Sequence, residues 1–142
     1  MKKLLLLSAL LLTFCSCSTE SENTQTNQSY LGKWVREFEY QYDSNNQLTQ
    51  VYNYSEEECY SMSTYEFNVD NEFVKDSYDF VNGDCVRNML RVYNYYFSGN
   101  TLTIYGLETE VFEILESEQN ILRLKISYPG IGHKIIEYSK IN

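Results

Sequence analysis

The sequence predicts an all-β protein: an up-and-down antiparallel meander of eight or nine strands that closes into a β-barrel. Three observations lead to this fold class. First, β-branched and aromatic residues cluster in runs of six to ten that are separated by Asn, Asp and Gly. Second, no window of ten or more residues shows the 3.6-residue apolar spacing of a helix. Third, hairpin-length turns join almost all of the runs, and such a meander removes its free edges only by closing on itself.

The first half of the chain contains four predicted strands, at residues 34–42, 48–55, 63–70 and 72–81. The alternation in the first of them places four aromatic residues on the face to be buried, namely Trp34, Phe38, Tyr40 and Tyr42. Arg36 is the one polar residue on that face. Residues 63–70 alternate in the same way, with Tyr65, Phe67 and Val69 on one side, and Asp70 with Asn71 predicts a tight hairpin turn.

The second half contains five more predicted strands, at residues 85–97, 101–106, 109–116, 121–128 and 133–140. Turns containing glycine precede three of them, at residues 82–84, 98–100 and 129–132. Near the end of the chain, alternation again selects one apolar face, formed by Leu122, Leu124 and Ile126. We expect this face to point into the barrel.

Several short segments together resemble the lipocalin-like domain of many small bacterial lipoproteins. They are LGKWV at 31–35, YEFNVDNEF at 65–73, GDC at 83–85, FSGNTLTI at 97–104, and LRLKISY and KIIEYSK near the end. The resemblance covers nearly all of residues 30–140. It implies a lipocalin-like β-barrel whose Trp34 plugs one end. True lipocalins carry apolar small molecules in the mouth of the barrel, whereas these bacterial domains have no assigned reaction.

The first sixteen residues are typical of an export leader, with two lysines before an apolar run at 4–14. That run is about half of the roughly 20 residues needed to cross a bilayer. Residues 14–17, FCSC, resemble the lipobox of bacterial lipoproteins, which implies that Cys17, behind the small Ser16, is the lipidated residue. Cys15 would then leave with the leader. Cleavage by the general signal peptidase is the alternative.

Residues 18–29 have no apolar side chain and predict a disordered polar tether. We therefore expect a signal peptide at 1–16, a lipidated cysteine and tether at 17–29, and a barrel domain at 30–142. This organisation predicts a monomer that is lipid-anchored to the outer membrane of the cell envelope, on its periplasmic or surface face. The lipid is its only expected contact with the membrane.

The formal net charge of the chain is −9, and loss of the leader lysines would make it more acidic. Such a surface repels nucleic acid, so we expect no nucleic-acid partner. An acidic balance favours solubility, and a specific basic partner is the alternative explanation.

Cys59 and Cys85 remain after the expected cleavage, in an exported chain where paired cysteines usually form a disulfide. The hairpin between them would carry the chain out and back, so both cysteines are expected at the same end of the sheet. Free thiols and a metal or redox site are the alternatives. A metal site lacks support because His133, the only histidine, is far along the chain.

The sequence offers no nucleophile elbow, phosphate-binding glycine loop or histidine metal pair. We therefore expect no enzymatic activity, no catalytic residue, no metal site and no cofactor. The acidic segments could place two carboxylates in a cleft, but no spacing in the sequence fixes such a pair.

Two functions are compatible with these features. In the first, the barrel binds a small apolar or amphipathic ligand through interior residues, for which we select Trp34, Phe38, Tyr65, Phe67 and Leu124. An interior void larger than roughly 300 Å³ would favour this function. In the second, tyrosine-rich outer faces bind a glycan or another envelope protein, because tyrosine offers a large amphipathic contact area at small entropic cost. The 14 tyrosines of the chain motivate this alternative.

Overall fold

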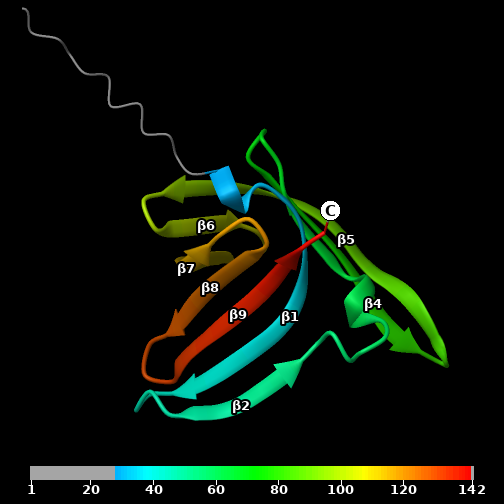
Figure 1. Ribbon diagram of the computed structural model, residues 1–142, viewed down its shortest axis with the longest axis horizontal. Helices are drawn as coiled ribbons and strands as arrows, with labels where there is room; N and C mark the ends of the chain where they lie inside the picture. Colours follow the sequence, from blue (N-terminus) through cyan, green and yellow to red (C-terminus); the bar gives the residue numbers. More distant parts are fainter. Residues whose placement is uncertain (1–27, 142) are drawn as a thin grey trace, which may run out of the picture.

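The computed structural model describes residues 28–141. They form nine strands and two single turns of 3₁₀ helix, η1 (Gln28–Tyr30) and η2 (Tyr60–Met62), which the sequence analysis did not predict. No helix within this range is long and apolar enough to cross a membrane. The strands (Figure 1) are β1 (Gly32–Asp43), β2 (Leu48–Asn53), β3 (Thr64–Phe67), β4 (Glu72–Val81), β5 (Asp84–Ser98), β6 (Thr101–Tyr105), β7 (Thr109–Ser117), β8 (Ile121–Tyr128) and β9 (Gly132–Lys140).

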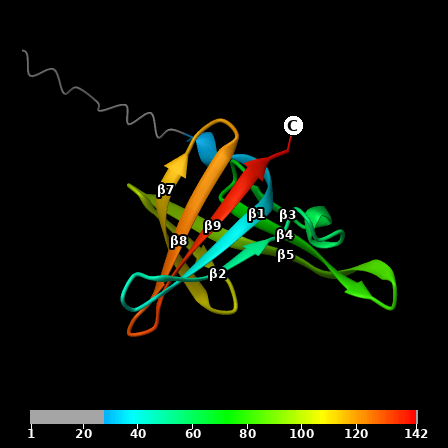
Figure 2. The same ribbon diagram turned by 60° about the horizontal axis from the view of Figure 1, so that its bottom comes forward.

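The strands form one closed antiparallel barrel. From β3 to β9 each strand pairs with the next, and β9 pairs with β1 along nearly its full length. Because β1 also pairs with β3, eight strands close on themselves and β2 is an extra strand outside the ring. Figure 2 shows β8, β9, β1 and β2 side by side on one wall. The predicted all-β barrel is confirmed, and closure leaves the ring itself without a free edge.

β1 pairs with two different strands along the same edge. Its first residues, Gly32–Val35, pair with β3, whereas Phe38–Tyr42 pair with β2. All but the last residue of β2 are exposed, since β2 lies outside the closed ring. The loop after β2 must therefore return to the barrel before β3 begins.

A β-bulge in β1 overturns the predicted alternation. Its register against β9 shifts between Arg36 and Phe38, so an additional residue enters the strand there. Before the bulge, Trp34 and Arg36 point inward; after it, Glu39 stands opposite the buried Ile136 and also points inward. Phe38, with Tyr40 and Tyr42 after it, consequently lies on the outer face. The expectation that these three aromatic residues line the interior is wrong, because a bulge reverses the parity of every later residue.

β3 is shorter than predicted. It ends at Phe67, and the Asn68 side chain accepts hydrogen bonds from the backbone N–H groups of Asp70 and Glu72. This turn, with Asn71 at a φ of 61°, confirms the predicted hairpin. It also removes Val69 from the strand face, since Val69 is 76% exposed rather than buried.

One end of the barrel is closed. The Trp34 side chain is fully buried there, and its indole N–H donates to the Tyr30 carbonyl at 2.8 Å. Tyr30 also stacks on Phe97, with ring centroids 3.8 Å apart. η1 thus lies over this end, and the implied position of Trp34 as its plug is confirmed. Leu122 and Leu124 are buried as predicted.

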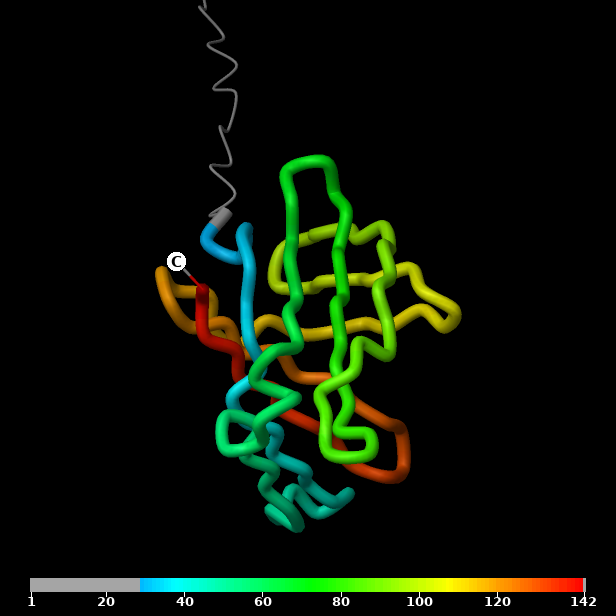
Figure 3. Tube along the Cα trace, turned by 90° about the vertical axis from the view of Figure 1, so that its right-hand side faces the viewer, coloured from blue at the N-terminus to red at the C-terminus, as the bar shows by residue number. Residues whose placement is uncertain are grey.

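The predicted disulfide between Cys59 and Cys85 is present, with Cα atoms 5.2 Å apart. It joins the loop that carries η2 to the start of β5, at the tip of the long β4–β5 hairpin. Figure 3 shows this loop next to the hairpin end. We refer to residues 54–63, the connection held by this disulfide, as the strap.

Candidate functional site

The interior holds a cavity of about 180 Å³ away from the end that Trp34 closes. Its inner part is apolar, formed by the buried Phe67, Phe73, Ile104, Phe112, Leu124 and Ile136 and by the partly buried Ile126. Ionisable and hydroxyl side chains line the rest, namely Arg36, Glu39, Tyr65, Lys75, Glu110, Tyr128, Lys134 and Tyr138. A single cavity therefore offers both an apolar surface and a charged one.

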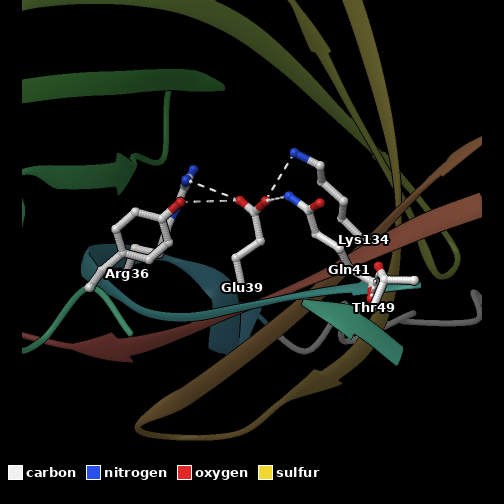
Figure 4. Close-up of polar contacts among 6 residues, drawn as sticks. Arg36, Glu39, Gln41, Thr49 and Lys134 are labelled. Atoms are coloured by element: carbon white, nitrogen blue, oxygen red, sulfur yellow. Dashed lines mark hydrogen bonds and ion pairs between the residues drawn. The ribbon is translucent and has the colours of Figure 1, made fainter. Parts of the chain in front are cut away.

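Glu39 is the centre of the charged part (Figure 4) and is only 5% exposed. One carboxylate oxygen accepts from Lys134 Nζ at 2.9 Å and from Gln41 Nε2 at 2.8 Å. The other oxygen lies 3.5 Å from Arg36 Nη1 and 3.5 Å from the Tyr54 hydroxyl. Burial alone would raise the pKa of Glu39, but the bonds from Gln41 and Lys134 and the two positive charges outweigh it, so this pKa is lowered.

The Arg36 guanidinium lies among three tyrosine rings. Its central carbon is 5.1 Å from the ring centroid of Tyr54, 5.2 Å from that of Tyr65 and 5.9 Å from that of Tyr138. These are cation–π distances. The Nε atom is buried and has no hydrogen-bond partner within residues 28–141. Arg36 is thus held in the cavity wall by Glu39 and the tyrosines while one of its donors stays unused.

Lys75, from β4, lines the same cavity. It follows the buried Phe73 by two residues, so strand alternation directs it inward. No carboxylate within residues 28–141 lies within ion-pair distance of the Lys75 ammonium group. The Lys134 ammonium group, by contrast, is paired with Glu39. Burial, and then the charge of Arg36, lower the pKa of Lys75, while Glu110 acts weakly in the opposite direction.

A second cavity, of about 230 Å³, adjoins the first and shares Arg36, Tyr65 and Lys75 with it. Its other side includes Tyr54, Tyr60 and Ser63 of the strap, together with residues of β4 and β5. The Ser63 hydroxyl accepts from the backbone N–H of Tyr78 at 2.9 Å, which holds the strap against β4. The disulfide-bound strap therefore borders the charged part of the site.

Comparison with known families agrees with this architecture. A family model described as a lipocalin-like domain matches residues 19–124, three quarters of the chain. The chain belongs to the lipocalin-like domain family. No curated protein matches it. Eight-stranded barrels of this size have room for one small ligand inside, as in lipocalins, so membership of the family suggests ligand binding in general.

The lipocalin-like barrel brings together some of the predicted site residues and separates others. Tyr65, Phe67 and Leu124 line the cavity. Trp34 is buried at the closed end and does not line it, and Phe38 lies outside the barrel because of the bulge. Cys17, the predicted lipidation site, lies outside the described residues. The ligand-binding role of the three lining residues stays a prediction.

The charged residues of the cavity were not predicted from the sequence as site residues. Lys75 and Lys134 occupy inward positions of β4 and β9, two residues from the buried Phe73 and Ile136. The available signal was a charged residue at a strand position where alternation predicts an apolar one. Arg36 was recognised only as the one polar residue on the aromatic face of its strand. Glu39 gave no signal, because without the bulge it would face solvent.

Proposed function

We propose that this chain is an envelope-anchored lipoprotein whose lipocalin-like barrel binds a small amphipathic ligand. The observation that carries the proposal is the combination, in one cavity, of a buried apolar surface with charged groups, of which Lys75 has no ion-pair partner among the described residues. Placing charges inside a barrel opposes folding unless they are paired, and apolar residues of similar volume are often at least as stable there. Perturbed ionisable groups in a cavity are common at functional sites.

The size of the cavity limits the ligand. An enclosed apolar cavity of about 150 Å³ holds a benzene-sized molecule. At about 180 Å³ the main cavity suits a single ring or a short chain. It does not reach the roughly 300 Å³ expected from the sequence to favour ligand binding, so the lining of the cavity and not its volume supports the proposal. A longer ligand would extend past Arg36 and Lys75 into the adjoining cavity.

Binding is tested with a neutral lipophilic fluorescent probe and by native mass spectrometry of protein exported by its own cell. We expect saturable binding with about one site per chain and a co-purifying small molecule. Ile126→Phe, which places a larger side chain into the cavity wall, should weaken probe binding. Ile135→Phe, the same substitution on the outer face, should not. Unsaturable probe uptake that is equal in both variants would contradict the proposal.

The anchor follows from the lipobox resemblance of residues 14–17 and from the polar tether at 18–29. Lipidation at Cys17 would hold the barrel close to the outer membrane, where amphipathic molecules are available. Cys17→Ser should abolish labelling by a fatty acid, whereas Cys15→Ser should leave it intact. Label on the Cys17→Ser protein would contradict this assignment.

One observation supports the alternative of a surface module. Tyr96 and Tyr105 are 59% and 51% exposed on the adjacent strands β5 and β6. The register pairs Tyr96 with Thr103 and Asn94 with Tyr105, so both rings share the outer face. A glycan or an envelope protein bound there should be lost on replacing both tyrosines by alanine, with probe binding in the cavity unchanged.

A further inference from the structure

The charges inside the barrel do not balance. Three cationic side chains line the cavity, Arg36, Lys75 and Lys134, against one buried carboxylate, Glu39. The other acidic residue of the lining, Glu110, is exposed at its rim. The interior therefore has an excess of positive charge, although the chain as a whole has a net charge of −9.

Glu39 cannot provide the missing negative charge. Its two oxygens already face Lys134, Gln41, Arg36 and the Tyr54 hydroxyl. A carboxylate has about four lone-pair positions, and four donor groups already lie within 3.5 Å of this one. A cationic ligand would therefore find no free acceptor on Glu39 and would meet three cations.

Lys75 is the group left uncompensated. Its neighbours from the surrounding strands are Arg36 on β1, Tyr65 on β3, Arg91 opposite it on β5, and Lys134 and Tyr138 on β9. Among residues 28–141, the exposed Glu110 on β7 acts against the lowering of the Lys75 pKa, and Asp79 on β4 lines the adjoining cavity with Lys75 but lies outside ion-pair distance. An arriving anion would relieve the repulsion among these cations and gain a partner in a site of low dielectric constant.

The phenols add neutral donors. Burial raises the pKa of Tyr65 to about 12, and burial also raises that of Tyr138. Both hydroxyls therefore keep their protons throughout the physiological range. They can donate a hydrogen bond to an anion and cannot repel it.

We propose that the ligand of this barrel is a small organic carboxylate, bound with its carboxylate on the Lys75 ammonium beside Arg36 and with its apolar part against Phe73 and Phe112. This inference rests on the proposed ligand-binding function and specifies its ligand class. A monoanion is favoured because one ammonium is unpaired, whereas Arg36 and Lys134 already share Glu39. The small cavity favours a single ring or short chain as the apolar part.

The test compares ligands that share the same apolar part and differ only in their polar head group. Phenylacetate, phenylacetamide and 2-phenylethylamine form one series, and hexanoate, hexanamide and hexylamine form the other. Affinities are measured by calorimetry and by displacement of the neutral probe. We expect each carboxylate to bind at least tenfold more tightly than its amide, and each amine to bind more weakly than the amide.

Lys75→Met should abolish this preference: carboxylate affinity falls about tenfold or more, while amide affinity changes less than about twofold. Lys33→Met is the matched control, because Lys33 is exposed on β1 and the change in net charge is the same. Lys33→Met should retain the preference. Lys75→Met should also melt at the same temperature as the wild type or higher, since it removes an unpaired interior charge.

A measurement on the wild-type protein keeps the test independent of the variants. Carboxylate affinity should fall as pH rises toward 10.5, because Lys75 loses its proton earlier than an ordinary lysine. Amide affinity should stay constant.

Equal affinities for carboxylate and amide would overturn the inference and leave the proposed function intact. A preference that survives in Lys75→Met would also overturn it, as would a protein that binds the neutral probe and none of the six compounds. Failure to bind the probe as well as the six compounds would reject the proposed function itself.

Discussion

Glu39 illustrates how single residues allow charge inside this barrel. The side chain is nearly inaccessible to solvent, yet its pKa is lowered, because hydrogen bonds from Gln41 and Lys134 and the nearby Arg36 outweigh the effect of burial. A carboxylate with a lowered pKa stabilises the fold above its ordinary pKa of 4.5, and this contribution disappears as the pH falls through its pKa in the folded state.

Glu39→Gln should therefore lower the free energy of unfolding by roughly 3 kcal/mol at pH 7, because it leaves Arg36 and Lys134 without their carboxylate. The difference from the wild type should shrink below pH 4.5, where the wild-type carboxylate takes up a proton. Urea denaturation across this pH range provides the measurement. Glu113→Gln, which breaks an exposed pair with Lys125, is the control and should cost less than about 1 kcal/mol. Equal losses in both variants would contradict the assignment.

Trp34→Ala should destabilise the protein by about 3 to 5 kcal/mol as a large-to-small change in a fully buried position. It also removes the hydrogen bond to Tyr30 that ties η1 to the closed end. Phe38→Ala should cost clearly less, because Phe38 lies on the outer face and is only half-buried. Thermal and chemical denaturation compare the two. A folded Trp34→Ala protein with an unchanged melting temperature would refute the role of Trp34 in the core.

At the scale of elements, the bulge in β1 and the strap decide which residues meet. The bulge turns both Arg36 and Glu39 inward, three residues apart, so that they can pair. The strap returns the chain from the outlying β2 and places Tyr54 over the guanidinium. Neither element adds a strand to the ring, but together they build the polar side of the cavity.

Replacing Cys59 and Cys85 together by serine should lower the free energy of unfolding by about 3 to 4 kcal/mol, the chain-entropy value for cysteines 26 residues apart. Because the strap borders the second cavity, the variant should also exchange the amide protons of residues 55–63 faster. Hydrogen exchange monitored by mass spectrometry measures this effect. Uniform acceleration over the whole barrel, with none specific to the strap, would contradict a local role for the disulfide.

At the scale of the whole molecule, pairing of β1 with β9 closes the barrel. The pairing runs from Trp34 with Lys140 to Asp43 with Gly132. At the end of this pairing, the backbones of β1 and β9 approach so closely that a Cβ on Gly132 would clash with the Tyr42 carbonyl oxygen. Gly132 also has a φ of +143°, which side-chain-bearing residues rarely adopt.

Gly132→Ala should consequently weaken the closure and destabilise the protein by more than about 3 kcal/mol, through backbone strain and the clash with β1. Gly130→Ala, in the same turn, meets no atom within 4 Å and has a φ of +75°, so about 1 to 2 kcal/mol is expected for it. Denaturation midpoints compare the two variants. Similar effects from both substitutions would show that close packing at the end of β1 is unimportant.

Much of the fold could be predicted from local pattern. The alternation of apolar residues and the turn residues between runs placed nine strands nearly correctly, because each strand buries one face and each hairpin needs specific turn residues. The disulfide was also predictable, since one hairpin separates its cysteines. In the candidate site, strand alternation predicted Tyr65, Phe67 and Leu124, which are apolar or aromatic residues at regular inward positions and which line the cavity.

The chain alone therefore determined the strands, the pairing of successive strands from β3 to β9 and the apolar wall, which depend on neighbours along the sequence. Only the tertiary structure decided the position of Phe38 and the charged cluster, since both depend on how β1 pairs with β9. A bulge is an event between two strands, and the residues of β1 do not encode it without their partner. Arg36, Glu39, Lys75 and Lys134 come from three strands, and the repulsion and pairing among their charges arise when the barrel closes around them.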